Sequence, residues 1–330
     1  MASELASNNS FSENEPLVSV VVPTYNSGDC LVQTITSLTD QTYANWEVIC
    51  VDDGSSDNTI DLLKELSQAD KRVKYYVRDS EAKGGSVCRN IGIKKAQGEF
   101  IIFLDSDDLL DNHCIRQRVA FALAEKNFDL YIFKMQIFYK TPGDSSELAV
   151  DFSIADPLKG FLLMKYPYPW HTTSPLWRKD FLAKIGAFNE SYPRLQDPEL
   201  HTKTLLTAGV KLKICKEEAV DCFYRVAPKT SKVSFSKRHL SGFYLFVSDF
   251  IPKVKTFDDE NNTNYSQVFN ESFKNAFKGI MLRLDLLPYL NKILAKGFEY
   301  KVLSVPVAIN IYAMFFSKML YYYLTLKNRD

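Results

Sequence analysis

The chain has 330 residues, enough for one large domain or for a domain with a sizeable extension, and 46% of them are hydrophobic, which favours a packed core over disorder. Its 40 basic and 40 acidic residues cancel, so no overall positive field attracts nucleic acid, and an anionic ligand has to be held by local groups. This balance argues against a general DNA- or RNA-binding protein.

The first fifteen residues are predicted to form a disordered tail. They are polar and rich in Ser, Asn and Glu, and they lack the basic start and apolar segment of a secretory signal. The six cysteines are scattered without a CxxC pair, which favours a reducing compartment. The sequence therefore predicts a cytoplasmic protein.

Strand and helix patterns alternate over the next ninety residues. Strands are expected at 17–22, 46–51, 73–77 and 100–104, and helices at 31–38, 59–67 and 86–96. The strands are short runs of large apolar residues, as expected of strands buried on both faces. The alternation predicts an α/β fold with a doubly wound, mostly parallel sheet and flanking helices.

The remainder of the chain is less regular at first and then largely helical. We expect one further strand at 128–138, a loop at 141–157, a helix beginning near Asp197, and helices from about Ser236 with a polar break at 258–264. The predicted organisation is therefore a folded α/β domain over 16–230 and a helical C-terminal region over 231–330.

Polar residues follow three of the predicted strands, in Pro23-Thr24-Tyr25-Asn26, Asp52-Asp53-Gly54-Ser55 and Asp105-Ser106-Asp107-Asp108. Ligands of open α/β sheets lie beyond the carboxyl ends of the strands. Three carboxylates within four positions suit a hard divalent ion that also binds phosphate oxygens, although an acidic turn capping the next helix is the alternative. The second cluster suits hydrogen bonds from a base or a ribose. Together the clusters favour a nucleotide and a metal.

Four motifs resemble those of the family 2 glycosyltransferases in order and spacing. They are Val20-Val21-Val22-Pro23-Thr24-Tyr25-Asn26, Val51-Asp52-Asp53-Gly54-Ser55-Ser56-Asp57, Gly84-Gly85-Ser86-Val87-Cys88-Arg89-Asn90 and Asp105-Ser106-Asp107-Asp108. The resemblance covers residues 16–226. It implies a GT-A type fold and an inverting, metal-dependent transfer of a sugar from a nucleotide-sugar donor, with a UDP-sugar as first choice, in cell-surface or capsular polysaccharide synthesis.

The resemblance also implies roles for individual residues. Pro23, Tyr25 and Asp53 would line the pocket of the nucleotide base, Gly84 and Arg89 would approach the phosphates or order the carboxylates, Asp105 and Asp108 would contact the donor, and Asp107 would bind Mn²⁺ or Mg²⁺. Asp107 is the first choice for the metal, but the sequence does not separate the roles of the three aspartates.

Asp197 matches the acceptor-side motif of the family, and the resemblance implies that it is the general base. An inverting transfer needs a carboxylate within hydrogen-bond reach of the attacking hydroxyl. Gln196 stands where many relatives carry Glu, which weakens the match. Glu199 is a weaker substitute, and a helix cap ahead of Pro198 is the structural alternative for Asp197.

A few other residues have both a functional and a structural interpretation. Arg225 faces a diphosphate or forms a structural salt bridge, His171 contacts the sugar or acceptor or is a structural histidine, and Trp170 and Trp177 stack on sugars or pack in the core.

The apolar segment at 302–316 is marginal in length for spanning a bilayer. Its tyrosines and nearby basic residues suit a helix lying in the headgroup region, at the inner face of the cell membrane, where a lipid-linked saccharide would be the acceptor. A helix packed on the catalytic domain or in a homodimer interface would have the same composition. The Gln-x-x-Arg-Trp motif of processive relatives is absent, so single-sugar transfer is expected.

Two other functions remain as alternatives. A sugar-phosphate nucleotidyltransferase should have a Gly-rich, basic loop after its first strand, and residues 23–28 lack one. A sugar-nucleotide-binding protein without transferase activity would be expected to lose either the base or the acidic pair. Turnover of a nucleotide sugar distinguishes this class from an enzyme.

Overall fold

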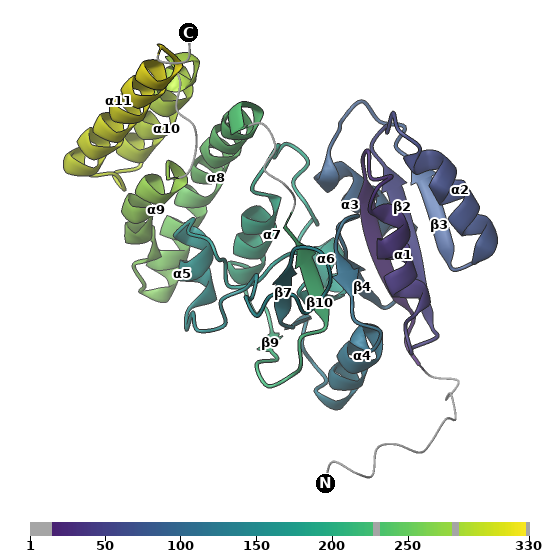
Figure 1. The fold of residues 1–330 in the computed structure, drawn as a ribbon. Coiled ribbons are helices and arrows are strands. Elements are labelled where there is room, and N and C mark those ends of the chain that lie inside the picture. The colour runs from purple at the N-terminus through teal and green to yellow at the C-terminus, as the bar shows by residue number, and fades with distance from the viewer. Residues whose placement is uncertain (1–14, 227–231, 279–283, 328–330) are drawn as a thin grey trace.

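The computed structural model describes residues 15–226, 232–278 and 284–327, without the side chains of 232–234 and 322–327 (Figure 1). Almost all of the predicted N-terminal tail and the predicted domain boundary at residue 230 therefore lie outside the described residues. An α/β part and a helical part, which follow each other along the chain, pack side by side (Figure 1).

The α/β part is organised by a seven-stranded sheet. Its strands, in spatial order, are β3 (Val73–Val77), β2 (Trp46–Asp52), β1 (Val18–Thr24), β4 (Phe100–Phe103), β8 (Pro175–Arg178), β6 (Leu130–Ile132) and β9 (Leu212–Ile214). The first four are parallel, and β8 runs antiparallel to both of its neighbours. The prediction of a mostly parallel sheet is confirmed.

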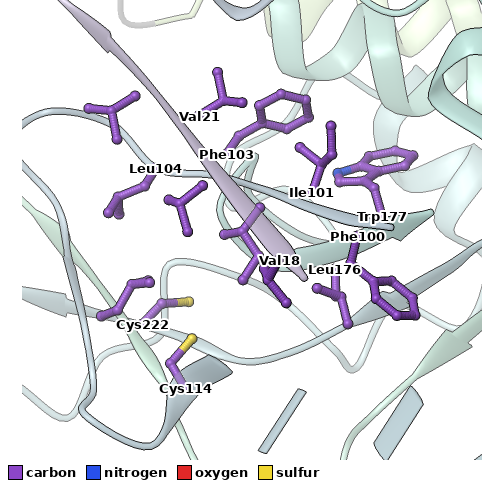
Figure 2. Close-up of a cluster of buried hydrophobic side chains, with 14 of the residues drawn as sticks. Val18, Val21, Phe100, Ile101, Phe103, Leu104, Cys114, Leu176, Trp177 and Cys222 are labelled. Atoms are coloured by element: carbon purple, nitrogen blue, oxygen red, sulfur yellow. The ribbon is translucent and has the colours of Figure 1, made fainter. Parts of the chain in front are cut away.

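Helices cover the faces of this sheet and bury its apolar side chains. They are α1 (Leu31–Thr39), α2 (Thr59–Ala69), α3 (Gly85–Lys95), α4 (Cys114–Ala124), α6 (Lys179–Lys184) and α7 (Gln196–Leu205). Figure 2 shows Val21 beside Phe103 and Ile101 beside Trp177 in the resulting core. Gly92 brings α3 close to β1, because a Cβ at this position would lie 2.3 Å from a methyl carbon of Val21.

The predicted single strand at 128–138 is wrong. Its first half is β6 of the main sheet, and its second half is β7 (Met135–Phe138), which joins β5 (Leu109–Leu110) and β10 (Cys222–Arg225) in a separate sheet. Both halves are equally apolar, so the pattern cannot show that the chain changes its pairing partners near Lys134. β8, which lies between β4 and β6, is likewise missing from the prediction.

The C-terminal region is helical, as predicted. It contains α8 (Lys232–Asn261), α9 (Phe269–Ala276), α10 (Leu287–Glu299) and α11 (Val305–Lys327), with short 3₁₀ turns at Tyr265–Val268 and Leu284–Leu286. The predicted polar break at 258–264 starts too early, because α8 continues to Asn261. Asp258 sits in its last turn and accepts hydrogen bonds from the backbone N–H groups of Tyr265 (2.7 Å) and Ser266 (2.8 Å).

These helices form a second hydrophobic core, which includes α5 (Pro157–Leu162) and the side chains of Tyr192 and Leu195 from the α/β part. One side of α11, with Val307, Ile311 and Phe315, is buried in this core. Among the described residues, no helix combines the length and the apolar character that crossing a bilayer requires.

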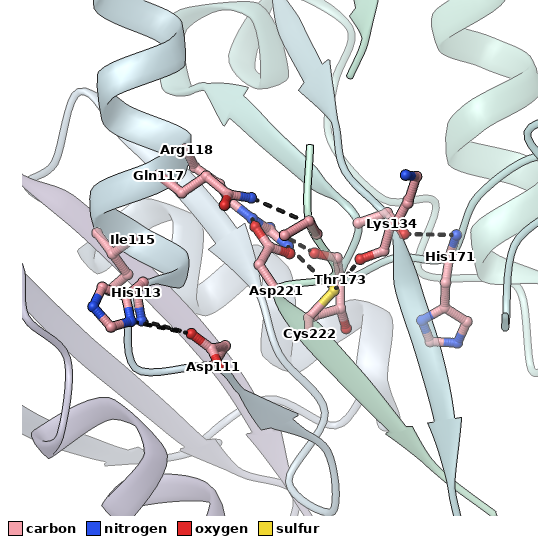
Figure 3. A network of polar contacts seen from close by, with 12 residues as sticks. Asp111, His113, Ile115, Gln117, Arg118, Lys134, His171, Thr173, Asp221 and Cys222 are labelled. Carbon is pink, nitrogen blue, oxygen red and sulfur yellow. Dashed lines mark hydrogen bonds and ion pairs between the residues drawn. The ribbon is translucent and has the colours of Figure 1, made fainter. Parts of the chain in front are cut away.

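A buried ion pair ties α4 to β10 (Figure 3). Arg118, which is inaccessible to solvent, donates through Nε and Nη2 to the two carboxylate oxygens of Asp221, at 2.8 and 2.7 Å. Its Nη1 donates to the carbonyl of Thr173 at 2.8 Å. Arg118 thereby links the loop that carries His171 to the start of β10.

Replacing Arg118 with Met should lower the free energy of unfolding by about 3–5 kcal/mol, because Asp221 would stay buried without its partner. Urea denaturation measures this loss. The double variant Arg118→Met with Asp221→Leu should recover at least half of it, since no charge is then left buried. Equal losses in the single and double variants would contradict the assignment of the loss to the ion pair.

Candidate active site

A cavity of about 230 Å³ opens where β1, β2 and β4 end at the same edge of the sheet. It is lined by Pro23, Thr24, Tyr25, Asp53, Gly85, Cys88, Asp105, Ser106 and Asp107. Five residues that the sequence assigned to the donor or the metal therefore surround one hollow. Gly84, Arg89, Asp108 and Asp197 are not among its lining residues.

A larger hollow of about 620 Å³ lies at the opposite edge of the sheet, where β4 and β6 begin. Its lining includes an ion pair between Arg178 Nη1 and Glu99 at 2.7 Å. None of the four motifs contributes a residue to this hollow. The smaller cavity is therefore the candidate active site.

Asp52 and Asp53 have different roles in the loop after β2. Asp52 is buried, and its Oδ2 accepts hydrogen bonds from the backbone N–H groups of Gly54 (2.9 Å) and Ser55 (2.8 Å), which fixes the turn. Asp53 lines the cavity and accepts from Arg78 Nε at 2.6 Å and from the backbone N–H of Gly84 at 2.9 Å. Asp53 is thus held in one orientation, with lone pairs left for a ligand.

Gly84 and Gly85 open α3 next to this carboxylate. Gly84 has a φ of +111°, a conformation that favours glycine, and this places its N–H on Asp53. Gly85 lines the cavity, and a Cβ there would lie 2.9 Å from Arg89 Nη1. The position of close approach to the cavity is therefore Gly85, whereas Gly84 supports Asp53.

Arg89 is a buried cation that lies between the cavity wall and the start of α7. It forms an ion pair with Asp105, and its Nη1 donates to Gln196 Oε1 at 3.1 Å. Burial alone would lower the pKa of this guanidinium, but Asp105 and Asp197 outweigh burial and raise it above its usual value. Of the two roles that the resemblance implies for Arg89, this geometry matches the ordering of the carboxylates.

Asp107 and Asp108 lie in a region with an excess of negative charge. Burial, followed by the nearby Asp105, raises the pKa of Asp107 above its ordinary value. Asp108 is fully buried, and burial with Asp105 and Asp107 raises its pKa further. Its Oδ1 accepts from the backbone N–H of Arg225 at 2.9 Å, while its Oδ2 has no hydrogen-bond partner among the described residues. A cation at this place would relieve the repulsion.

Protein side chains alone do not complete a metal site here. In the described part of the chain, no three or more His, Cys, Asp or Glu side chains converge closely enough to hold an ion. Mg²⁺ is usually bound by one or two carboxylates together with substrate phosphates, and this pattern does not require such a cluster. Asp107, which faces the cavity, fits the role of a single carboxylate ligand.

The side chain of Arg225, at the end of β10, donates hydrogen bonds to uncharged oxygens. Its Nε donates to the carbonyl of Asp107 at 2.7 Å, and its Nη2 donates to Gln33 Oε1 at 2.8 Å. Its side chain thus fixes the backbone of the acidic turn. The structural salt bridge considered from the sequence is replaced by these hydrogen bonds.

Asp197 lies in the first turn of α7, with its Oδ2 3.8 Å from His171 Nε2. Burial alone would raise the pKa of this carboxyl, but His171 and Arg89 outweigh burial and hold it below its usual value. Asp197 is therefore ionised at neutral pH, as a general base has to be. Glu199 is engaged with Lys203 at 2.9 Å and is buried, which argues against it as a substitute.

Comparison with known proteins identifies the family that part of this chain matches. Residues 19–156 match the family described as Glycosyl transferase family 2. The chain contains a family 2 glycosyltransferase domain. The chain is similar to an uncharacterized glycosyltransferase of Haemophilus influenzae, with 42% identity over 33% of this chain and 44% of the relative.

Two further bacterial relatives are similar to this chain over segments of about the same length. TuaG of Bacillus subtilis, a putative teichuronic acid biosynthesis glycosyltransferase, is 38% identical over 33% of this chain and 43% of its own length. The Escherichia coli glucosyltransferase WfgD is 41% identical over 32% and 41%. The matched segment spans less than half of each of these relatives.

Solved structures extend the likeness of fold beyond the family 2 domain. Residues 1–349 of S. aureus TarS superpose with a TM-score of 0.60 at 19% identity, over 86% of this chain and 80% of that one. The Pyrobaculum calidifontis mannosyltransferase PcManGT gives 0.53 at 16%, over 93% and 86%. The predicted GT-A type fold, with its helical C-terminal extension, is confirmed.

Other side chains around the family 2 domain are structural, or were missing from the sequence prediction. Trp170 Nε1 donates to His201 Nδ1 at 2.9 Å, and Trp177 stacks on the same ring, so both tryptophans pack in the core. Arg78 was not predicted, although it directly follows β3 and therefore reaches the same edge as Asp53. That position after a strand was the available signal.

Proposed function

We propose that this protein is an inverting, metal-dependent glycosyltransferase that moves a single sugar from a nucleotide-sugar donor to an acceptor hydroxyl. One observation supports this most strongly. Asp53 and Asp107 line a single cavity, and Arg89, which contacts Asp105 in the cavity wall, interacts electrostatically with the ionised Asp197. The site therefore combines a place for a nucleotide diphosphate with a carboxylate base.

A UDP-sugar is the proposed donor. Pro23 and Tyr25 would bind the base, with Asp53 accepting a hydrogen bond from a ring N–H. The relative WfgD is a UDP-Glc-dependent glucosyltransferase by name, and TarS has been crystallised with UDP-GlcNAc. Gly84 would act indirectly, through its hydrogen bond to Asp53.

Mn²⁺ or Mg²⁺ is the proposed cofactor, held by Asp107 together with oxygens of the diphosphate. Asp105 and Asp108 would contribute negative charge to the same region rather than direct ligands, because Asp105 is paired with Arg89 and Asp108 is fully buried outside the cavity lining. When bound, the ion would neutralise the charge that develops on the leaving diphosphate. The PcManGT complex contains GDP-Man and Mn²⁺.

Asp197 is the proposed general base. It would accept the proton of the acceptor hydroxyl while the oxygen attacks the anomeric carbon on the face opposite the departing diphosphate. This direction of attack inverts the configuration. His171 Nε2 lies 3.8 Å from Asp197 and, when protonated, helps to keep the carboxylate charged before the proton arrives.

The proposed acceptor is a lipid-linked saccharide at the cytoplasmic face of the membrane. The outer side of α11 exposes Val305, Ile309, Phe316 and Leu320, whose spacing places them on one face. Residues 287–321 contain four lysines and a single acidic residue, Glu299, which complements an anionic bilayer. WfgD acts on a diphosphoundecaprenol-linked sugar by name, and a cell-surface polysaccharide is the proposed product.

The decisive experiment is transfer by the purified protein. UDP-Glc, UDP-GlcNAc and GDP-Man are offered with Mn²⁺ and a synthetic α-GlcNAc-diphosphate lipid, and the product is followed by mass spectrometry and its anomeric configuration by NMR. Inverted product from one donor is expected. Donor binding without turnover of any donor would instead identify a sugar-nucleotide-binding protein.

Asp197→Asn should leave donor affinity near normal and reduce kcat about a hundredfold or more, because the amide cannot accept the acceptor proton. Isothermal titration and steady-state kinetics measure the two quantities. Asp61→Asn, the same change at an exposed position in the first turn of α2, is the control and should be silent. A near-normal rate in Asp197→Asn would assign the base to another residue.

Asp107→Ala should abolish the part of donor binding that depends on Mn²⁺. The wild-type protein should lose the same part when EDTA is added, whereas Asp61→Ala should behave as wild type. Titration of the donor with and without Mn²⁺ tests this. Wild-type donor affinity that EDTA leaves unchanged would remove the metal from the mechanism.

The double variant Ile309→Glu with Phe316→Glu should lose binding to phosphatidylglycerol vesicles in a sedimentation assay, because charges would replace the exposed apolar face of α11. Leu123→Glu, at an exposed apolar position on α4, is the matched control and should bind normally. If the double variant instead converts a wild-type dimer to a monomer, the face is a homodimer interface.

A further inference from the structure

The segment directly before Asp197 is held by one face of α8. Phe235, Gly242 and Asp249 are spaced seven residues apart on this helix, so they lie along nearly the same side. The segment they contact is residues 192–195, which leads into α7. A helix of the C-terminal region thus touches the chain just ahead of the proposed base.

Three different contacts join α8 to this segment. The guanidinium of Arg194 lies over the ring of Phe235, 3.9 Å from its centroid. The backbone of α8 at Gly242 approaches the carbonyl of Arg194 so closely that a Cβ would lie 2.5 Å from its oxygen. The hydroxyl of Tyr192 donates to Asp249 Oδ2 at 2.8 Å.

The segment needs such support because it is strained. Leu195 has a φ of +65°, in the left-handed region, which costs about 1–2 kcal/mol for a residue with a side chain. Its side chain is 8% exposed and belongs to the second hydrophobic core. Burial among the C-terminal helices therefore holds Leu195 in a conformation that an isolated loop would leave.

A hydrogen-bond path continues from this segment to the cavity. Gln196 Nε2 donates to the carbonyl of Tyr192 at 3.3 Å, and Gln196 Oε1 accepts from Arg89. Arg89 in turn pairs with Asp105 in the cavity wall. The glutamate that many relatives carry at this position could not donate to the Tyr192 carbonyl. The amide of Gln196 can both donate to this carbonyl and accept from Arg89, which the path requires.

We propose that the face of α8 centred on Gly242 is a positioning element for sugar transfer, which sets the place of Asp197 by fixing residues 192–195. This inference rests on the proposed function. Asp197 follows the strained Leu195 by two residues, so a shift of the segment moves the base directly. A displacement of about 1 Å at a catalytic group can slow a reaction about a hundredfold.

Gly242→Ala tests the proposal, because the added methyl group has to push α8 and the Arg194 carbonyl apart. We expect kcat to fall tenfold or more with donor affinity within twofold of wild type. Gly297→Ala is the matched control. Its Cβ would crowd Leu303 and Phe273 at 2.7 and 2.8 Å inside the same helical region, but it does not touch residues 192–195. It should lower the melting temperature and leave kcat unchanged.

Asp249 supplies a second, milder pair of variants. Asp249→Ala removes the acceptor of the Tyr192 hydroxyl and should lower kcat, whereas Asp249→Asn keeps an acceptor oxygen and should restore it. A folded Gly242→Ala protein with wild-type kcat, or equal kcat in the two Asp249 variants, overturns the proposal. Absence of transfer by the wild type would instead refute the proposed function, so the two failures are distinguishable.

Discussion

The site depends on the balance between clustered carboxylates and a few buried arginines. Asp105, Asp107 and Asp108 follow one strand within four residues. Burial, followed by repulsion from the neighbouring carboxylates, raises the pKa of Asp107 and Asp108. Arg89 compensates Asp105 from α3 and also stabilises the charge of Asp197 across the site. Asp107 stays the least compensated carboxylate that faces the cavity. A cation that arrives with a diphosphate is the simplest way to complete this balance.

Much of the fold could be predicted because its signals are local. The first four strands and the three helices between them lie within a few residues of their predicted positions, since each strand is a short apolar run that ends at polar residues. The prediction that the polar residues after these strands lie at one edge of the sheet followed from the rule that ligands bind beyond the carboxyl ends of parallel strands. Pro23, Tyr25, Asp53 and Asp107 indeed surround one cavity there. Their individual roles toward a donor stay predictions.

The rest could not be predicted because it depends on contacts distant in sequence. The change of partner between β6 and β7 is set by Ser174, whose carbonyl accepts from Phe133, and by β10, almost ninety residues further on. Gly84 and Gly85 have different roles because Gly84 donates to Asp53 whereas Gly85 lies close to Arg89, and the positions of Asp53 and Arg89 are not visible in the local sequence. The composition of α11 could not separate packing from surface exposure, and the structure shows both, with one side buried and the opposite side exposed.

The helical extension has a structural reason to be part of the enzyme. In the α/β part, the strand ends alone can position the acidic turn, because each cavity carboxylate lies within four residues of the end of a β-strand. Asp197 has no such support, since its helix begins after an irregular segment with a left-handed residue. The second core supplies this support by burying Tyr192 and Leu195 against α8. The donor side and the acceptor side of the site therefore draw their rigidity from different cores, and Gln196 and Arg89 connect them. A change in the face of α8 that contacts residues 192–195 should consequently affect transfer before it affects donor binding.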